Sequence, residues 1–172
     1  MHEEAFFDSV KNDLYFKVNK SIVQGEKCNV LKIKTKENYY YLSAYANFDC
    51  SFEKNIFIKM SFDEYVNIVF GSTDVEGVAI YRDGEYIFFN HLYLRWLNIK
   101  QDLDDFLCTL DIVDEKEIEE QIAKYHSQRY REHLIDVKNM FDKKAYEKAY
   151  NILCMLLQLY PNNLSETYII VE

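Results

Sequence analysis

The dipeptide Asp83-Gly84 constrains the fold of this chain more than any other pair of residues. It stands between two apolar stretches, residues 75–82 and 85–90, and Asp-Gly favours a two-residue type I′ turn. Such a turn fixes the register of the two strands, pairing Arg82 with Glu85 and Tyr81 with Tyr86. We therefore predict a β-hairpin with two apolar or aromatic faces. Val78, Ile80, Ile87 and Phe89 share one face, and Ala79, Tyr81, Tyr86 and Phe88 share the other. A hairpin that is apolar on both faces is expected inside a sheet rather than at a wet edge.

A capped helix precedes the hairpin. Ser61 is a strong N-cap residue, and Glu64 three positions later completes a capping box. Gly71 is expected at the C′ position, where glycine commonly ends a helix. Gly77 lies inside the first hairpin strand, where a side chain would collide with a packed helix or where the strand is bulged.

The remaining elements follow from hydrophobic periodicity and turn residues. They predict an α+β fold, with a mixed or antiparallel sheet of about five strands flanked by helices, followed by a C-terminal helical hairpin. We expect two parts, an α+β domain at 1–100 and a helical extension at 101–172 packed on it. The predicted helices are 3–16, 61–71, 91–98 (capped by Asn90, with Leu92 and Trp96 buried), 101–110, 114–141 and 143–160; the other strands are 28–35, 39–46 and 56–59, with 167–171 either a terminal strand or a frayed tail.

Composition excludes several classes of protein. The chain has 172 residues and a net charge of −9, which argues against a nucleic-acid surface, because phosphates require a basic stripe. Its four cysteines form no C-x-x-C pair, so free thiols in a reducing compartment are favoured over disulfides or a zinc site. We expect no signal peptide from the N-terminal sequence, and no apolar run is long enough to span a bilayer. We therefore expect a cytoplasmic protein that does not bind membranes.

A family resemblance rests on the segment around the hairpin. Met60-Ser61-Phe62 closes a short strand and opens a helix, and DVEGVAI at 74–80 opens the next strand. With the element order before them, these motifs resemble the N-terminal domain of the SseB family (enhanced serine sensitivity proteins). The resemblance covers about the first hundred residues and implies an α+β fold. It carries over no catalytic residues.

A second resemblance covers roughly residues 130–163. AYEKA at 145–149 and LQLYPNN at 157–163 look like the second half of a tetratricopeptide repeat. No second copy follows at the repeat spacing, and one unit alone cannot form the concave groove of an array. A plain helical hairpin is therefore favoured over a peptide-binding repeat.

The sequence offers weak candidates for catalysis. His126, Arg129, Tyr130 and His133 share part of one helix face, but two histidines seven residues apart cannot bind one metal unaided, so an interhelical or solvated polar stripe is favoured. Asp102, Asp104 and Asp105 lack the glycine and the closing glutamate of a calcium loop. Cys50 with His91 could in principle pair as nucleophile and base. Phosphate-binding and hydrolase motifs are absent from the sequence. We therefore predict no catalytic, cofactor-binding or metal-binding residues.

We expect a non-catalytic, SseB-like protein that acts through a protein-binding surface. Acidic residues gather at 102–120, which is usually a solvated face but could instead steer a basic partner. The expected binding residues are Asp102, Asp104, Asp105, Asp111, Glu115 and Glu119 with Tyr39, Tyr41 and Tyr45. One alternative is an immunity protein that neutralises a basic toxin. Another is a small enzyme that depends on Cys50 or His91. The sequence leaves open whether the chain forms a homodimer.

Overall fold

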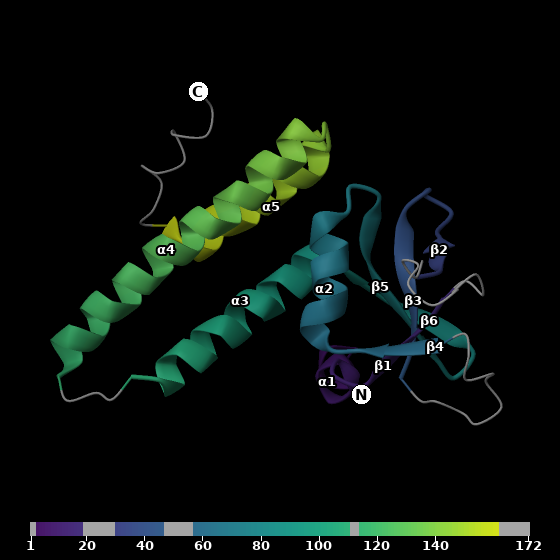
Figure 1. Ribbon diagram of the computed structural model, residues 1–172, viewed down its shortest axis with the longest axis horizontal. Helices are drawn as coiled ribbons and strands as arrows, with labels where there is room; N and C mark the ends of the chain where they lie inside the picture. Colours follow the sequence, from purple (N-terminus) through teal and green to yellow (C-terminus); the bar gives the residue numbers. More distant parts are fainter. Residues whose placement is uncertain (1–2, 19–29, 47–56, 111–113, 162–172) are drawn as a thin grey trace, which may run out of the picture. The chain divides into compact units, whose positions relative to one another are not determined.

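The computed structural model describes residues 3–18, 30–46, 57–110 and 114–161, and these residues form an α+β fold with a mixed sheet (Figure 1). The predicted fold class is confirmed. The chain divides into two compact units, Met1–Arg95 and Trp96–Glu172, and the boundary falls inside a helix. The elements are α1 (Glu3–Val10), β1 (Leu14–Lys17), β2 (Lys32–Lys34), β3 (Tyr40–Tyr45), β4 (Phe57–Met60), α2 (Phe62–Gly71), β5 (Val75–Arg82), β6 (Glu85–Asn90), α3 (His91–Cys108), α4 (Glu115–Asp142) and α5 (Tyr146–Leu159).

The sheet of the first unit has the strand order β4-β1-β3-β5-β6, and β2 also pairs with β3. β3 and β5 are parallel, whereas the other pairs are antiparallel. The Leu31 amide donates to the Lys17 carbonyl oxygen, 2.8 Å away, and the Ser43 amide donates to the Leu31 carbonyl oxygen, 3.0 Å away. β2 therefore continues the line of β1 along the same side of β3.

One face of this sheet holds the core of the first unit. Leu14, Phe16, Leu42, Ala44, Val78, Ile80 and Phe89 are all buried, and the strand register places them on this face. Helices α1 and α2 lie against it (Figure 1). The ring of Phe7 on α1 packs 4.4 Å from Phe89 and 6.3 Å from Phe62, measured between centroids. Phe16 packs 5.2 Å from Tyr65 of α2.

The first predicted helix was too long. The helix ends at Val10, and the segment after it turns back as β1. Leu14 kept the helical spacing of the preceding residues, so the pattern alone did not show the break. Strand formation here comes from pairing with β3 and β4, where Leu14 faces Met60 and Phe16 faces Ala44.

The capping box and the hairpin register are confirmed. The Glu64 amide donates to Ser61 Oγ at 3.4 Å, and the Ser61 amide donates to Glu64 Oε2 at 2.7 Å. Arg82 pairs with Glu85 and Ile80 with Ile87 around the turn. Asp83 and Gly84 both have positive φ, 51° and 97°, as a type I′ turn requires.

Gly71 does not have its predicted role, and of the two roles predicted for Gly77 the collision with a helix is wrong whereas the irregular strand register is observed. Gly71 is the last helical residue rather than a C′ cap, and the chain leaves α2 through Ser72 in an extended conformation. Gly77 is needed because a Cβ there would overlap the Phe89 carbonyl oxygen on β6, not a helix. The register also shifts at this point, because Tyr40 faces Val75 while Tyr41 faces Gly77.

Among the strands that the structure describes, β6 is the last in the order, so the hairpin lies at the edge of the described sheet and not in the predicted interior position. After it, Asn90 caps α3 as predicted, its side-chain oxygen accepting from the Tyr93 amide at 2.9 Å. α3 is one helix of 18 residues, not two short helices. No proline or glycine interrupts it. Trp96 is 38% exposed, and Leu94 and Leu97 are buried instead.

The second unit contains the rest of α3 with α4 and α5. Asp114 caps α4 by accepting from the Lys116 amide at 3.2 Å. α4 and α5 pack together as the expected helical hairpin, which buries Tyr130, Leu134, Val137, Ala149, Ile152 and Leu156. His126 and His133 of the predicted polar stripe point to α5, with their rings 5.4 and 6.4 Å from that of Tyr160. The predicted strand at 167–171 lies outside the described residues.

Candidate functional site: an aromatic face of the sheet

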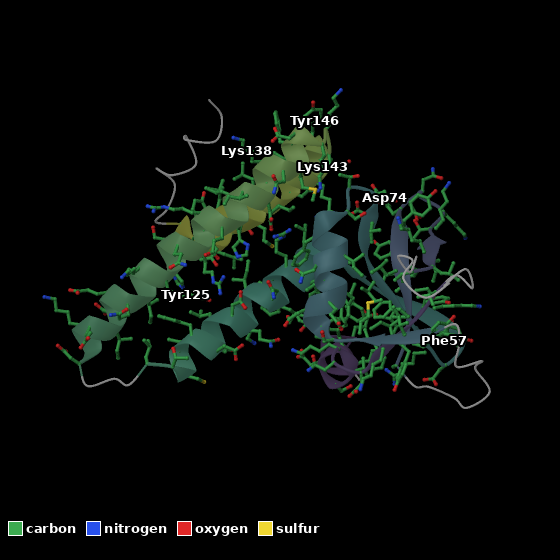
Figure 2. The ribbon with its side chains drawn as sticks, in the orientation of Figure 1. Phe57, Asp74, Tyr125, Lys138, Lys143 and Tyr146 are labelled. Carbon is green, nitrogen blue, oxygen red and sulfur yellow. The ribbon has the colours of Figure 1, made fainter. Side chains whose placement is uncertain are left out.

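The second face of the sheet carries a continuous group of aromatic rings. The register places Tyr45, Tyr81 and Tyr86 side by side across β3, β5 and β6. The group, here called the aromatic face, consists of Tyr41, Tyr45, Phe57, Tyr81, Tyr86 and Phe88. Figure 2 shows Phe57 among the side chains of the sheet. Among these rings Tyr81 is 39% and Phe88 is 45% exposed.

Each ring of the aromatic face touches the next. Tyr45 lies 5.4 Å from Phe57 and 5.6 Å from Tyr81, measured between centroids. Tyr81 lies 5.2 Å from Tyr86, which in turn lies 6.5 Å from Phe88. Several contacts are edge-to-face, the geometry that aromatic pairs prefer. The rings are therefore held in a fixed arrangement before any partner arrives.

Small residues lie between the aromatic rows. Ser43 and Ala79 occupy the next register position, beside Phe88, and both are buried. Ser43 Oγ lies 3.5 Å and Tyr45 Oη lies 3.3 Å from Tyr86 Oη. Three hydroxyl groups thus meet at the centre of an otherwise apolar surface, where they can orient a polar group of a partner.

The phenol groups of Tyr41 and Tyr45 are uncharged at neutral pH. Burial raises the pKa of Tyr45 above its usual 10.0, and the hydrogen bond with Tyr86 raises it further. Burial also raises the pKa of Tyr41, and the nearby Glu76 carboxylate adds to this shift. A surface that stays neutral favours contact with apolar or uncharged groups.

A groove continues the aromatic face at one end. It has a volume of about 470 Å³ and lies between the β2–β3 turn and the sheet. Tyr41 and Phe88, with ring centroids 5.0 Å apart, line it together with Lys34, Lys36 and Glu37. Tyr39, one of the predicted binding residues, also lines it. The groove gives the aromatic face a concave part with mixed charge around it.

The structure places the predicted tyrosines on or beside this surface. Tyr41 and Tyr45 belong to the aromatic face, and Tyr39 is 45% exposed at its end. Phe57, Tyr81, Tyr86 and Phe88 were not among the predicted binding residues. A signal for three of them was present, since the hairpin register placed Tyr81, Tyr86 and Phe88 on one face. The edge position of β6 among the described strands and the exposure of Tyr81 and Phe88 were not predicted.

The predicted acidic residues belong to the second unit. Asp104 and Asp105 on α3 and Glu119 on α4 are exposed. Asp102 is half-buried, and its Oδ2 lies 3.7 Å from a guanidinium nitrogen of Arg129. Part of its charge is therefore neutralised within the unit. Asp111 lies outside the described residues, as does the side chain of Glu115.

The candidate base His91 is buried, at 4% exposure, and its Nδ1 lies 3.0 Å from Glu76 Oε2. Its Nε2 has no hydrogen-bond partner among the described residues. His91 does not line the groove beside the aromatic face. Cys50 lies outside the described residues. The enzyme alternative thus stays a prediction.

The sequence predicts no metal site, no membrane span and free cysteine thiols, and the described residues bear on each of these. Within the described part of the chain, no group of three or more histidine, cysteine or acidic side chains is arranged to hold a metal ion. The helices formed by the described residues are all too short or too polar to cross a membrane. Among the four cysteines, the two that the structure describes, Cys108 and Cys154, are free thiols.

No protein-family model, curated protein or solved structure matches the chain. The resemblance to the SseB family therefore remains a prediction from the motifs.

Proposed function

We propose that this is a non-catalytic, SseB-like protein that binds another protein through the aromatic face. The observation that carries the proposal is the contiguous set of half-exposed rings on one face of the sheet. Contiguous exposed apolar surface commonly marks an interaction site, and tyrosine is enriched among the residues that dominate binding energy. The free thiols of Cys108 and Cys154 support a reducing compartment such as the cytoplasm.

The sheet edge beside the aromatic face suggests how a partner binds. A two-residue turn makes Arg82 and Glu85 a hydrogen-bonded pair, and the bonding alternates along the hairpin from there. The backbone groups of Tyr86 and Phe88 consequently point away from β5. No described strand pairs with that outer side of β6. An extended segment of the partner can add there as a new strand.

Such an added strand would extend the aromatic face. Alternate side chains of the segment would lie beside Tyr86 and Phe88, because side chains in register share a face. The edge has one charged residue, Glu85, and lacks the lysines and prolines that often protect edge strands from pairing. We therefore expect the partner to present an extended segment with apolar residues at alternate positions.

Affinity capture from cells of the source organism tests this proposal. Phe88→Ala removes a ring but keeps the edge amide, whereas Phe88→Pro removes both. Proline is tolerated at an edge position whose amide faces outward. Tyr150→Ala is the control, because Tyr150 is 66% exposed in the second unit.

We expect the wild-type protein and the control to retain a stoichiometric partner. Phe88→Ala should weaken binding about tenfold, and Phe88→Pro should abolish capture. Equal recovery of the partner by all four proteins would refute a role for the aromatic face and the edge.

The exposed carboxylates support a second candidate, an acidic surface that binds a basic protein such as a toxin. Asp104 and Asp105 lie near the end of α3, and Glu119 and Glu120 lie near the start of α4. Binding through this surface should weaken with added salt. It should also weaken in the double variant Asp104→Asn, Asp105→Asn, while Phe88→Ala leaves it unchanged. The opposite pattern would exclude this candidate.

A further inference from the structure

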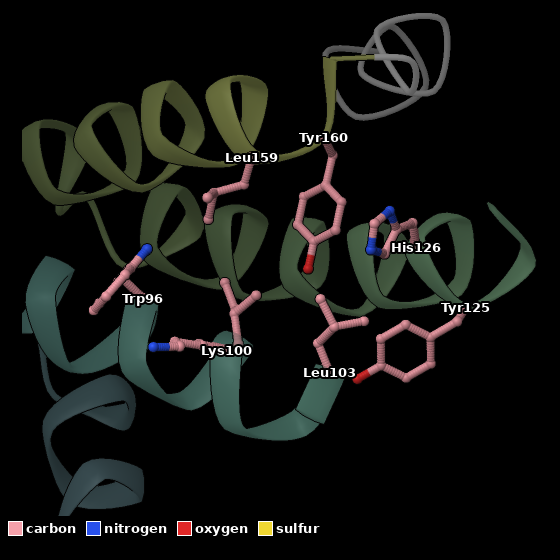
Figure 3. Close-up of a pocket in the computed structure, with 8 residues that line it drawn as sticks. Trp96, Lys100, Leu103, Tyr125, His126, Leu159 and Tyr160 are labelled. Atoms are coloured by element: carbon pink, nitrogen blue, oxygen red, sulfur yellow. The ribbon is translucent and has the colours of Figure 1, made fainter. Parts of the chain in front are cut away.

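A cavity of about 200 Å³ lies within the second unit, and none of its lining residues belongs to the aromatic face. α3 and α4 form its sides and the end of α5 closes it, as Figure 3 shows. Its surface is mainly apolar and aromatic, with contributions from Trp96, Leu103, Tyr125 and Leu159. Concave, mostly apolar sites with a few polar groups are typical of small-molecule binding.

Tyr160 supplies a hydroxyl group to the cavity. The residue is 4% exposed, and its hydroxyl group points into the cavity (Figure 3). No described residue forms a hydrogen bond with this hydroxyl. Burial raises the pKa of Tyr160 to about 12, so the group stays a neutral donor. The hydroxyl is not one of the fully buried polar atoms that lack a partner, so it is accessible from the cavity, and a ligand there can form a hydrogen bond with it.

Lys100 supplies a positive charge at the same cavity. Its Nζ lies 5.5 Å from the centre of the Trp96 ring, and no carboxylate of the described residues lies within ion-pair distance. His126 also lines the cavity, but burial lowers its pKa, so its ring is neutral at neutral pH. Arg129, nearby on α4, is already paired with Glu132 at 2.6 Å. Of the described side chains that line the cavity, Lys100 therefore carries the positive charge.

We propose that this cavity binds a small aromatic carboxylic acid. The ring lies among Trp96, Leu103 and Leu159, the carboxylate pairs with Lys100, and the Tyr160 hydroxyl supplies a further hydrogen bond. Size sets the class of ligand, because an apolar cavity of about 150 Å³ is known to hold benzene. A volume of about 200 Å³ holds one ring with a short substituent.

Trp96 provides a direct readout, because it is the only tryptophan in the chain and lines the cavity. We would titrate the full-length protein with benzoate and follow Trp96 fluorescence. The neutral isostere benzamide serves as the matched ligand. We expect a saturable change with benzoate, and an affinity for benzamide that is about tenfold lower, since it cannot form the charge-assisted contact with Lys100.

Two variants test whether Lys100 and Tyr160 contribute to benzoate binding. Lys100→Met keeps the length of the side chain but removes its charge, and should weaken benzoate binding about tenfold without changing benzamide binding. Tyr160→Phe removes only the hydroxyl and should weaken benzoate about fivefold. Lys124→Met on α4 is the control, because Lys124 is exposed and does not line the cavity. Far-UV circular dichroism checks that each variant is folded.

The absence of a saturable response to benzoate would overturn the proposal. Equal affinities for benzoate and benzamide would overturn the assignment of an acid. The same affinity in wild type, Lys100→Met and Tyr160→Phe would show that any binding occurs elsewhere.

Discussion

Replacing Gly77 by alanine tests the packing that holds the β5–β6 hairpin in place. A Cβ at this position would overlap the Phe89 carbonyl oxygen and lie 2.8 Å from the Asn90 Cα. These are backbone atoms, so no side chain can rotate away, and β6 itself must shift. Overpacking of this kind costs about 3 kcal/mol. The lower entropy of the unfolded alanine variant offsets about 0.7 kcal/mol. We expect a net loss of about 2 kcal/mol in the free energy of unfolding.

Gly71→Ala is the matched control. A Cβ at Gly71 would have no neighbouring atom within 4 Å, and the φ of Gly71 is not positive. Alanine also favours the helix that Gly71 ends, so this variant should gain about 0.7 kcal/mol. Urea unfolding followed by circular dichroism should separate the two variants by about 3 kcal/mol. A Gly77→Ala protein as stable as the Gly71→Ala protein would refute the close approach of β5 and β6.

The capping box and the buried phenol on α2 yield three further expectations. Ser61→Ala should lower the free energy of unfolding by about 1 kcal/mol, measured by urea denaturation at neutral pH. The hydrogen bonds from Ser61 hold the pKa of Glu64 below its usual 4.5, so this stabilisation is present above pH 4.5 and is lost as the pH falls through the lowered pKa. The variant keeps the bond from the Ser61 amide but loses the bond from Ser61 Oγ to Glu64 Oε2 at 3.0 Å. The difference between wild type and Ser61→Ala should therefore shrink in part in acid, and a constant difference would argue against the bond from Ser61 Oγ to the Glu64 carboxylate. Tyr65→Phe should cost about 1.5 kcal/mol, because the Tyr65 hydroxyl donates to the Lys11 carbonyl oxygen at 3.0 Å; an unchanged unfolding midpoint would argue against that bond.

Local chemistry made part of the fold predictable. A two-residue turn allows only one register of the two strands. The Asp83-Gly84 turn therefore predicted every cross-strand residue pair of the hairpin, starting with Arg82–Glu85. Ser61 and Glu64 marked the start of α2 for the same reason, since the hydrogen bonds of a cap involve residues close in sequence. These features need no knowledge of the rest of the chain.

Features that depend on distant residues were missed. Leu14 continues a helical pattern, yet it lies in β1 because β3 and β4 provide pairing partners. The same limit affects the aromatic face. Alternation along the hairpin showed that Tyr81 and Phe88 share a face, but the packing of distant segments on the sheet decides whether that face is covered. The cavity beside Tyr160 was not foreseen, because it forms where three helices meet.

Amide hydrogen exchange in the presence of the captured partner tests the central proposal most directly. Tyr86 and Phe88 have outward amides that should exchange readily in the free protein, whereas the Ile87 amide is directed at Ile80 within the hairpin. Adding the partner should slow exchange at Tyr86 and Phe88 and leave Ile87 nearly unchanged. Protection confined to the acidic residues at 102–120, with no change at Tyr86 and Phe88, would contradict binding at the aromatic face and its edge.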